Sequence, residues 1–172
     1  MGSVALTVNG EEVTLTYSDY DTSEFLLYLL REQLPLQGPR FGCGVSECGC
    51  CTVLINGAPV RSCVTEVSTL SAGDQITTLE GIGTPQHPHP MQQAFVDLQA
   101  GQCAFCCNSM IMGAIGFING RVAAGNRTLP TKQEIADFLS GNTTDPPLKY
   151  ICRCGAHLRI MAAIEQAAGQ ML

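Results

Sequence analysis

The residues with the clearest chemistry in this 172-residue chain are its ten cysteines. At that density, cysteines are disulfide partners, metal ligands or redox groups. The first eight residues lack the basic region and long apolar core of a secretory signal, so the cytoplasm is the expected compartment. Clustered cysteines there bind metal more often than they form disulfides. Their spacing therefore decides which kind of centre to expect.

The first group of cysteines has the spacing of a plant-type ferredoxin loop. Three follow a Cys-x4-Cys-x2-Cys pattern, and the fourth comes after an Asn56-Gly57 turn that returns the chain towards the loop. Gly42, Gly44 and Gly49 supply positions for φ > 0 and leave backbone N–H groups free to donate to sulfur. A zinc site is the alternative, but structural zinc usually takes paired knuckles. We expect a 2Fe-2S cluster on Cys43, Cys48, Cys51 and Cys63.

The second group consists of a Cys-x2-Cys pair and a Cys-x-Cys pair, and it is less specific by itself. A thioredoxin-like redox pair would need a preceding strand in a βαβ unit, whereas this pair lies between predicted helices. Zinc stays open as an alternative, although Cys-x-Cys leaves little chain for a knuckle. We expect a second 2Fe-2S cluster on Cys103, Cys106, Cys152 and Cys154.

The remaining polar and sulfur side chains suggest no further centre. Cys50 and Cys107 are spare thiols, expected to pack inward as small apolar residues. His87 and His89 each precede a proline in a linker, and both quartets are complete without them. The carboxylates are scattered, without a Ser/His/Asp or paired-carboxylate set. The chain is expected to carry electrons and to make or break no substrate bonds.

Hydrophobic periodicity predicts an α+β fold in two parts. Alternating residues predict strands over 4–8, 13–17, 52–55 and 75–79, with one helix over 25–34 that Asp21-Thr22-Ser23 would cap. A proline-rich stretch, 84–90, is predicted to be a linker. Beyond it, apolar spacing predicts four helices, one opened by a Thr131-x-x-Glu134 capping box and ended by Gly141. The predicted domains are 1–83 and 91–172.

Composition excludes some partners and suggests another. The net charge is −6 and no basic run occurs, which argues against nucleic acid. No apolar run approaches the roughly 20 residues of a membrane span. Charged residues make up only 14% of the chain, which suggests that a permanent partner covers part of its surface.

Four stretches around the cysteines resemble the small iron-sulfur subunit of the xanthine oxidase family of molybdenum hydroxylases. The resemblance runs from the first hairpin to the last helix, with both four-cysteine motifs in the family's order. The stretches are Gly42 to Val53, Arg61-Ser62-Cys63, Gln102 to Cys106 and Cys152 to Gly155.

The resemblance implies a β-grasp ferredoxin domain followed by a four-helix domain. It also implies a large partner subunit that binds molybdopterin cytosine dinucleotide and carries out the hydroxylation, so this chain by itself would have no turnover. In the family, the glutamine before the first cysteine of the helical domain contacts the pterin, and the last cysteine of that set lies near it. Those residues are Gln102 and Cys154 here.

The sequence departs from the family pattern in three places, and none removes a ligand. Cys50 stands where a small residue is usual, Cys107-Asn108-Ser109 replaces a frequent Thr-Pro-Gly, and 143–150 looks like an insertion. The ending Cys152 to His157 is more similar to the isoquinoline, nicotinate and membrane aldehyde dehydrogenase branch. The resemblance therefore implies an N-heteroaromatic or aldehyde substrate, and an electron acceptor that is either a cytochrome or a flavin subunit. Membrane association or export through a partner subunit is the alternative to a cytoplasmic location.

A free-standing double-cluster ferredoxin that shuttles between partners is the alternative function. The low charged fraction disfavours it, because reversible docking works best with a strongly charged face. The apolar helix faces are expected to bury the second cluster, and the glycine-rich loop to leave the first near the surface. Electrons would then pass from molybdenum to the Cys103 group and outward through the Cys43 group.

Overall fold

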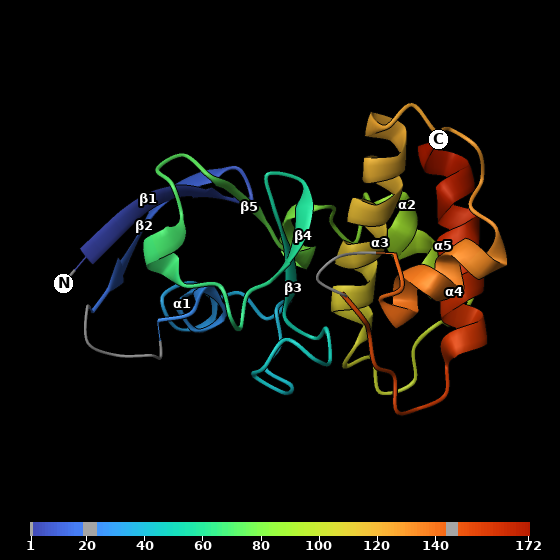
Figure 1. The fold of residues 1–172 in the computed structure, drawn as a ribbon, viewed down its shortest axis with the longest axis horizontal. Coiled ribbons are helices and arrows are strands. Elements are labelled where there is room, and N and C mark those ends of the chain that lie inside the picture. Colours follow the sequence, from blue (N-terminus) through green and yellow to red (C-terminus); the bar gives the residue numbers. More distant parts are fainter. Residues whose placement is uncertain (1, 19–23, 144–147) are drawn as a thin grey trace.

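The chain folds into a five-stranded sheet with one helix, followed by a group of four helices (Figure 1). The computed structural model describes residues 2–18, 24–143 and 148–172. The strands are β1 Gly2–Val8, β2 Glu11–Tyr17, β3 Thr52–Ile55, β4 Ala58–Arg61 and β5 Gln75–Thr77. The helices are α1 Leu26–Glu32, α2 Pro90–Asp97, α3 Cys107–Ala123, α4 Lys132–Ser140 and α5 His157–Met171, with 3-10 turns at Val67–Thr69 and Leu79–Gly81. The α+β prediction is confirmed.

The sheet has the strand order β2-β1-β5-β3-β4. β1–β2 and β3–β4 are antiparallel hairpins, and β1 pairs with β5 in parallel. Both hairpins turn at Asn-Gly pairs with positive φ, because this backbone matches the right-handed twist of the strands. The alternating side chains of β1 face a core that α1 closes from the other side. The pairing of β3 with β4 places the segment after β4, which carries Cys63, beside the loop before β3.

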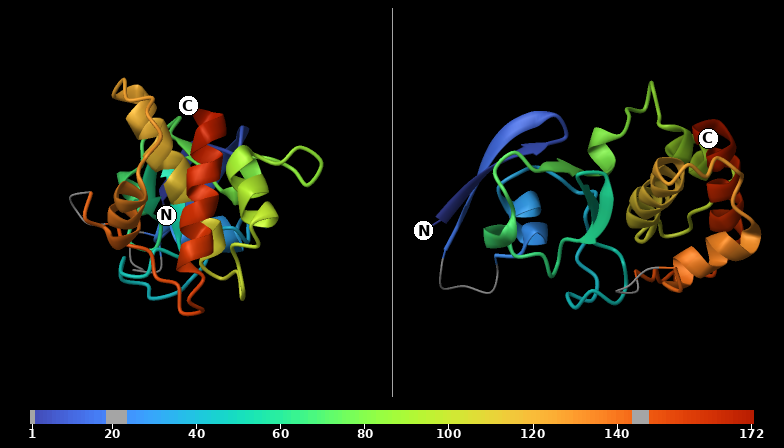
Figure 2. Two further views of the ribbon diagram at one scale, coloured as in Figure 1. Left: turned by 90° about the vertical axis from the view of Figure 1, so that its right-hand side faces the viewer. Right: turned by 45° about the horizontal axis from the view of Figure 1, so that its top comes forward.

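α3 lies between the sheet and the other helices (Figure 2). Its apolar residues are buried on nearly every side, which is typical of a helix that is covered all round. Gly116 allows close approach to the sheet, because a Cβ there would lie 2.8 Å from the Pro59 ring. One hydrophobic core therefore joins β3 to α2, α3, α4 and α5.

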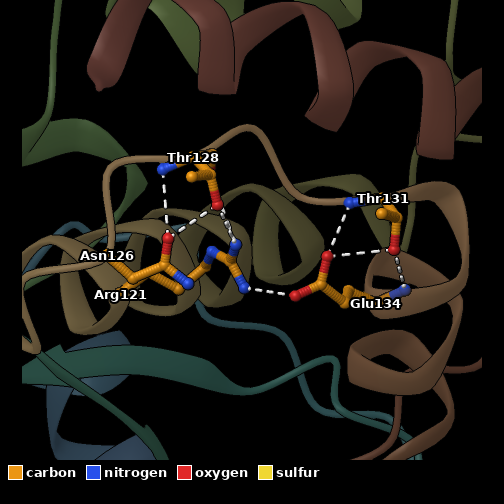
Figure 3. A network of polar contacts seen from close by, with 5 residues as sticks. All are labelled: Arg121, Asn126, Thr128, Thr131 and Glu134. Atoms are coloured by element: carbon orange, nitrogen blue, oxygen red, sulfur yellow. Dashed lines mark hydrogen bonds and ion pairs between the residues drawn. The ribbon is translucent and has the colours of Figure 1, made fainter.

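The predicted start and end of α4 are confirmed. Thr131 accepts from the Glu134 N–H at 3.2 Å, and the Glu134 carboxylate accepts from the Thr131 N–H at 2.7 Å. Gly141 ends the helix with a φ of 81°. Arg121 in α3 donates to the other Glu134 oxygen at 2.7 Å and also reaches Thr128 (Figure 3). The capping box therefore also ties α4 to α3.

Several boundaries differ from the sequence prediction. β5 ends at Thr77 because the chain turns into the Leu79–Gly81 turn, and α2 already begins at Pro90. His89 caps α2, since its Nδ1 accepts from the Met91 N–H at 3.1 Å. The predicted caps at 21–23 and half of the predicted insertion, residues 144–147, fall outside the described residues. None of the helices in the described ranges is long and apolar enough to cross a bilayer.

Candidate metal centres

The four cysteines of the first predicted group come together around one loop. The Cys43 N–H donates to Cys48 Sγ at 3.3 Å, and the Cys51 thiol donates to Cys63. The N–H of Ser46, between the first two cysteines, donates to the Cys63 sulfur and so joins the two pairs. Cys51 and Cys63 are buried, whereas Cys43 and Cys48 are partly exposed.

Backbone N–H groups surround the sulfur of Cys43. Val45, Glu47 and Cys48 donate to it at 3.4, 3.2 and 3.3 Å. Burial would raise the pKa of the Cys43 thiol, but these donors outweigh it and lower that pKa. The loop therefore favours the thiolate, which is the form that binds metal.

The loop needs its glycines for two different reasons. Gly44 and Gly49 have φ values of 71° and 82°, as the sequence predicts. At Gly42 the reason is space instead, because a Cβ there would lie 2.7 Å from Cys48 Sγ. Both features keep the backbone close to the sulfurs.

The second predicted group also forms two pairs. Cys154 Sγ lies 3.3 Å from Cys103 Sγ. The Cys106 thiol donates to the spare Cys107, which raises the pKa of Cys106, and the Cys106 sulfur also accepts from Cys152. The N–H of Phe105 and the Cys154 side chain lower the pKa of the Cys103 thiol. Two pairs of thiols suit a 2Fe-2S cluster, in which each of two irons takes two protein ligands. Among the described residues, no three potential ligands converge as they would around a single ion.

The expectation that the helical part buries its own cysteines is wrong for Cys103. Cys103 is exposed and Cys154 partly exposed, while Cys106 and Cys152 are buried. The apolar helix faces pack against one another and against β3, so they do not cover the loop that carries Cys103. The exposure of these cysteines therefore does not indicate which of the two groups would pass electrons to the other.

The two spare thiols are buried, as predicted. Cys50 and Cys107 are 5% and 8% exposed. Burial raises the pKa of Cys50 to about 12, with the neighbouring sulfur of Cys48 as a further cause. Cys107 begins α3 beside Gly101, where a Cβ would lie 3.1 Å from its sulfur. Neither is needed to complete a quartet.

Two arginines of the first part bind the segments that carry the second group. Arg40 donates to the Ala104 and Phe105 carbonyls at 2.6 and 3.1 Å, and Arg61 donates to the Lys149 carbonyl at 2.6 Å. Sequence reasoning missed both. The only signal in the sequence was that both lie near cysteines of the first group, and this does not predict which residues they contact.

Gln102, the predicted pterin contact, lies at the surface beside the second group. It lines a shallow hollow of about 260 Å³ together with Gly155 and Arg159. Leu158, at the same hollow, is 82% exposed. The hollow thus combines amide, guanidinium and apolar groups next to Cys103 and Cys154.

Comparison with known proteins identifies the family. The family model of a 2Fe-2S binding domain matches residues 78–165, which include the second cysteine group. A nicotinate dehydrogenase subunit of Pseudomonas putida is 43% identical over 166 residues, covering 96% of this chain and 94% of that protein. The alpha subunit of isoquinoline 1-oxidoreductase from Brevundimonas diminuta is 38% identical over 161 residues, covering 94% of each.

A solved structure gives the same assignment. The aldehyde oxidoreductase of Desulfovibrio gigas superposes with a TM-score of 0.85 at 33% identity, over 99% of this chain and 17% of that longer chain. The predicted resemblance is therefore confirmed. The chain belongs to the non-catalytic 2Fe-2S iron-sulfur subunits of the xanthine oxidase family of molybdenum hydroxylases.

Proposed function

We propose that this chain passes electrons from a molybdopterin centre in a large partner subunit, through two 2Fe-2S clusters, to a cytochrome or flavin acceptor. Its first part would be a β-grasp ferredoxin domain and its second a four-helix cluster domain. The ligands would be the two cysteine quartets described above. Each cluster, when bound, takes up and releases one electron. The relatives' names, nicotinate dehydrogenase and isoquinoline oxidoreductase, support an N-heteroaromatic substrate for the complex, with an aldehyde as the alternative.

One backbone hydrogen bond carries the proposal. The N–H of Ile151 donates to the carbonyl oxygen of Cys48 at 3.0 Å. Ile151 directly precedes Cys152, so one hydrogen bond and one peptide link connect Cys48 of the first quartet to Cys152 of the second. A short path of this kind between two ligand segments favours electron transfer between two redox centres in series.

Electrons would enter at the Cys103 group. Gln102 and Cys154 lie at the surface hollow described above, where a pterin held by the partner could approach them. The Gln102 amide can both donate and accept hydrogen bonds, which suits a pterin edge. Electrons would leave through the Cys43 group. This direction rests on the placement of Gln102 and Cys154 at the hollow, because cysteines of both groups are accessible.

Metal analysis tests the cofactor content. The chain purified with its cofactors should contain about four irons and about four acid-labile sulfides, because each 2Fe-2S cluster takes four thiolates. Zinc should be negligible. A content of two irons would contradict the second cluster.

Rapid-freeze EPR of the whole complex tests the order. With Cys48→Ala, substrate should still reduce molybdenum and the Cys103-group cluster, and electrons should stop there. With Gln102→Leu, the Cys43-group cluster should remain but be reduced more slowly. Magnetic coupling of Mo(V) to the Cys43-group cluster would reverse the proposed order.

A further inference from the structure

Arg61 in β4 is a buried cation, only 3% exposed. Its Nη1 donates to the Thr52 hydroxyl, its Nη2 donates to the Lys149 carbonyl at 2.6 Å, and its Cζ lies 4.3 Å from the centre of the Tyr150 ring. All three partners are neutral. Among the described residues Arg61 forms no ion pair, whereas Arg121 pairs with Glu134 and Lys149 pairs with Glu47. Because a buried charge is costly without compensation, its counter-charge should lie close by.

The first cysteine quartet can supply that negative charge, because two of its members lie close to Arg61 along the paired strands β3 and β4. Arg61 lies opposite Thr52 in the β3–β4 register, and Thr52 directly follows Cys51. The next residue, Ser62, donates from its N–H and hydroxyl to the Cys51 carbonyl at 3.4 and 2.7 Å, and Cys63 follows.

We propose that Arg61 is the internal counter-cation of the cluster bound by the first quartet and raises its reduction potential. Reduction adds one negative charge to the cluster, so a fixed positive charge nearby stabilises the reduced state. Burial strengthens this effect and protects it from salt. The proposal rests on the proposed function only in that the first quartet binds a 2Fe-2S cluster. Arg61 would thus favour reduction of the first cluster when an electron arrives from the second.

Arginine and lysine would bring the same positive charge to this position, but only arginine can make all the contacts seen there. Its planar fork reaches Thr52 and Lys149 together and stacks on Tyr150, whereas a lysine would keep the charge and lose most of this geometry. Comparing Arg61→Lys with neutral variants therefore separates the effect of charge from that of position. Arg121 provides a matched control, because it lies near Phe117 and forms an ion pair with Glu134, away from the cysteines.

The test is an EPR-monitored redox titration of both clusters in the full chain. The signals are assigned with Cys48→Ala. Arg61→Gln should shift the electron-exchange equilibrium between the clusters about tenfold away from the first, equivalent to about 59 mV for a one-electron couple. Arg61→Lys should stay within about threefold of the wild type, since it keeps the charge. Arg121→Gln should change neither potential.

The outcomes distinguish this proposal from the proposed function. If Arg61→Gln keeps the first cluster at its wild-type potential, or Arg61→Lys lowers that potential as much as Arg61→Gln, the counter-cation proposal is wrong while the electron order stands. If Arg61→Gln and Arg61→Met both lose the first cluster but Arg61→Lys keeps it, the requirement for charge is supported. If Arg61→Lys loses it too, the contacts matter and the proposal fails. A wild-type chain with no first cluster would contradict the proposed function itself.

Discussion

The hydroxyl of Ser109 in α3 donates a hydrogen bond to the carbonyl oxygen of Cys50 in the first cysteine loop. Both residues are buried, at 1% and 5% exposure, and the same carbonyl accepts from the Arg40 N–H at 3.0 Å. This contact crosses from the helical part to the sheet part. It fixes the loop of the first quartet against the start of the helix that follows Cys106.

Ser109→Ala should lower the free energy of unfolding by about 1 kcal/mol, the usual net value of one hydrogen bond. The loss should stay near that size because Arg40 still satisfies the carbonyl. Thermal unfolding of the cluster-loaded chain measures it. Ser140→Ala is the control, since that hydroxyl bonds to Ala136 on an exposed helix end. Equal effects of the two substitutions would contradict the structural role of Ser109.

The ligand assignment predicts which cysteines can be replaced. Cys50→Ala and Cys107→Ser should keep both clusters, because the quartets are complete without them. Cys48→Ala should lose the first cluster and keep the second. Iron content and EPR measure each outcome. Loss of the first signal in Cys50→Ala would show that Cys50, and not a neighbour, is the ligand.

The capping box predicts a pH dependence. The Thr131 N–H, the Arg121 guanidinium and the Thr131 hydroxyl lower the pKa of Glu134 from 4.5 to about 2. A carboxyl with a lowered pKa stabilises the fold above its unfolded pKa and loses that contribution as the pH falls through its folded pKa. The stability difference between wild type and Glu134→Gln should therefore be full at neutral pH and should shrink between about pH 4.5 and about pH 2.

Circular dichroism of thermal unfolding over that pH range measures the difference. Acid release of the clusters affects both proteins and cancels in the comparison. Glu32→Gln, at the exposed end of α1, controls for the loss of one negative charge. A wild-type advantage that persists unchanged to the lowest pH would mean that the charge of Glu134 does not stabilise α4.

Local signals in the sequence were enough for most of the elements. The Asn-Gly pairs and the Thr131 capping box each act over a few residues, and the structure has the turns and the helix start where predicted. Contacts between the two parts could not be predicted in this way. Arg61 and Lys149 are 88 residues apart, and only the packing of α3 on β3 brings them together. The exposure of Cys103 was mispredicted for the same reason, because helix periodicity gives apolar faces but not what they cover.

Gly113 in α3 should be intolerant of any side chain. A Cβ there would overlap the hydroxyl and ring of Tyr150, which is 7% exposed. Tyr150 has little room to move, because two other side chains pack against its ring. The Arg61 Cζ lies 4.3 Å from the ring centre, and the centre of the Phe138 ring lies 5.3 Å from it. Overpacking of this kind costs about 1–3 kcal/mol.

Gly120 in the same helix provides the matched control for Gly113. It is exposed, and a Cβ added there would meet no atom within 4 Å, so Gly120→Ala should stabilise α3 by up to about 1 kcal/mol through helix propensity alone. Gly113→Ala gains the same propensity but must displace Tyr150, so its net effect should be destabilising. Because Tyr150 precedes Ile151 and Cys152, the displacement should also broaden the EPR signal of the second cluster. If both substitutions raise the melting temperature equally, Tyr150 does not fill the space against α3 that the structure gives it.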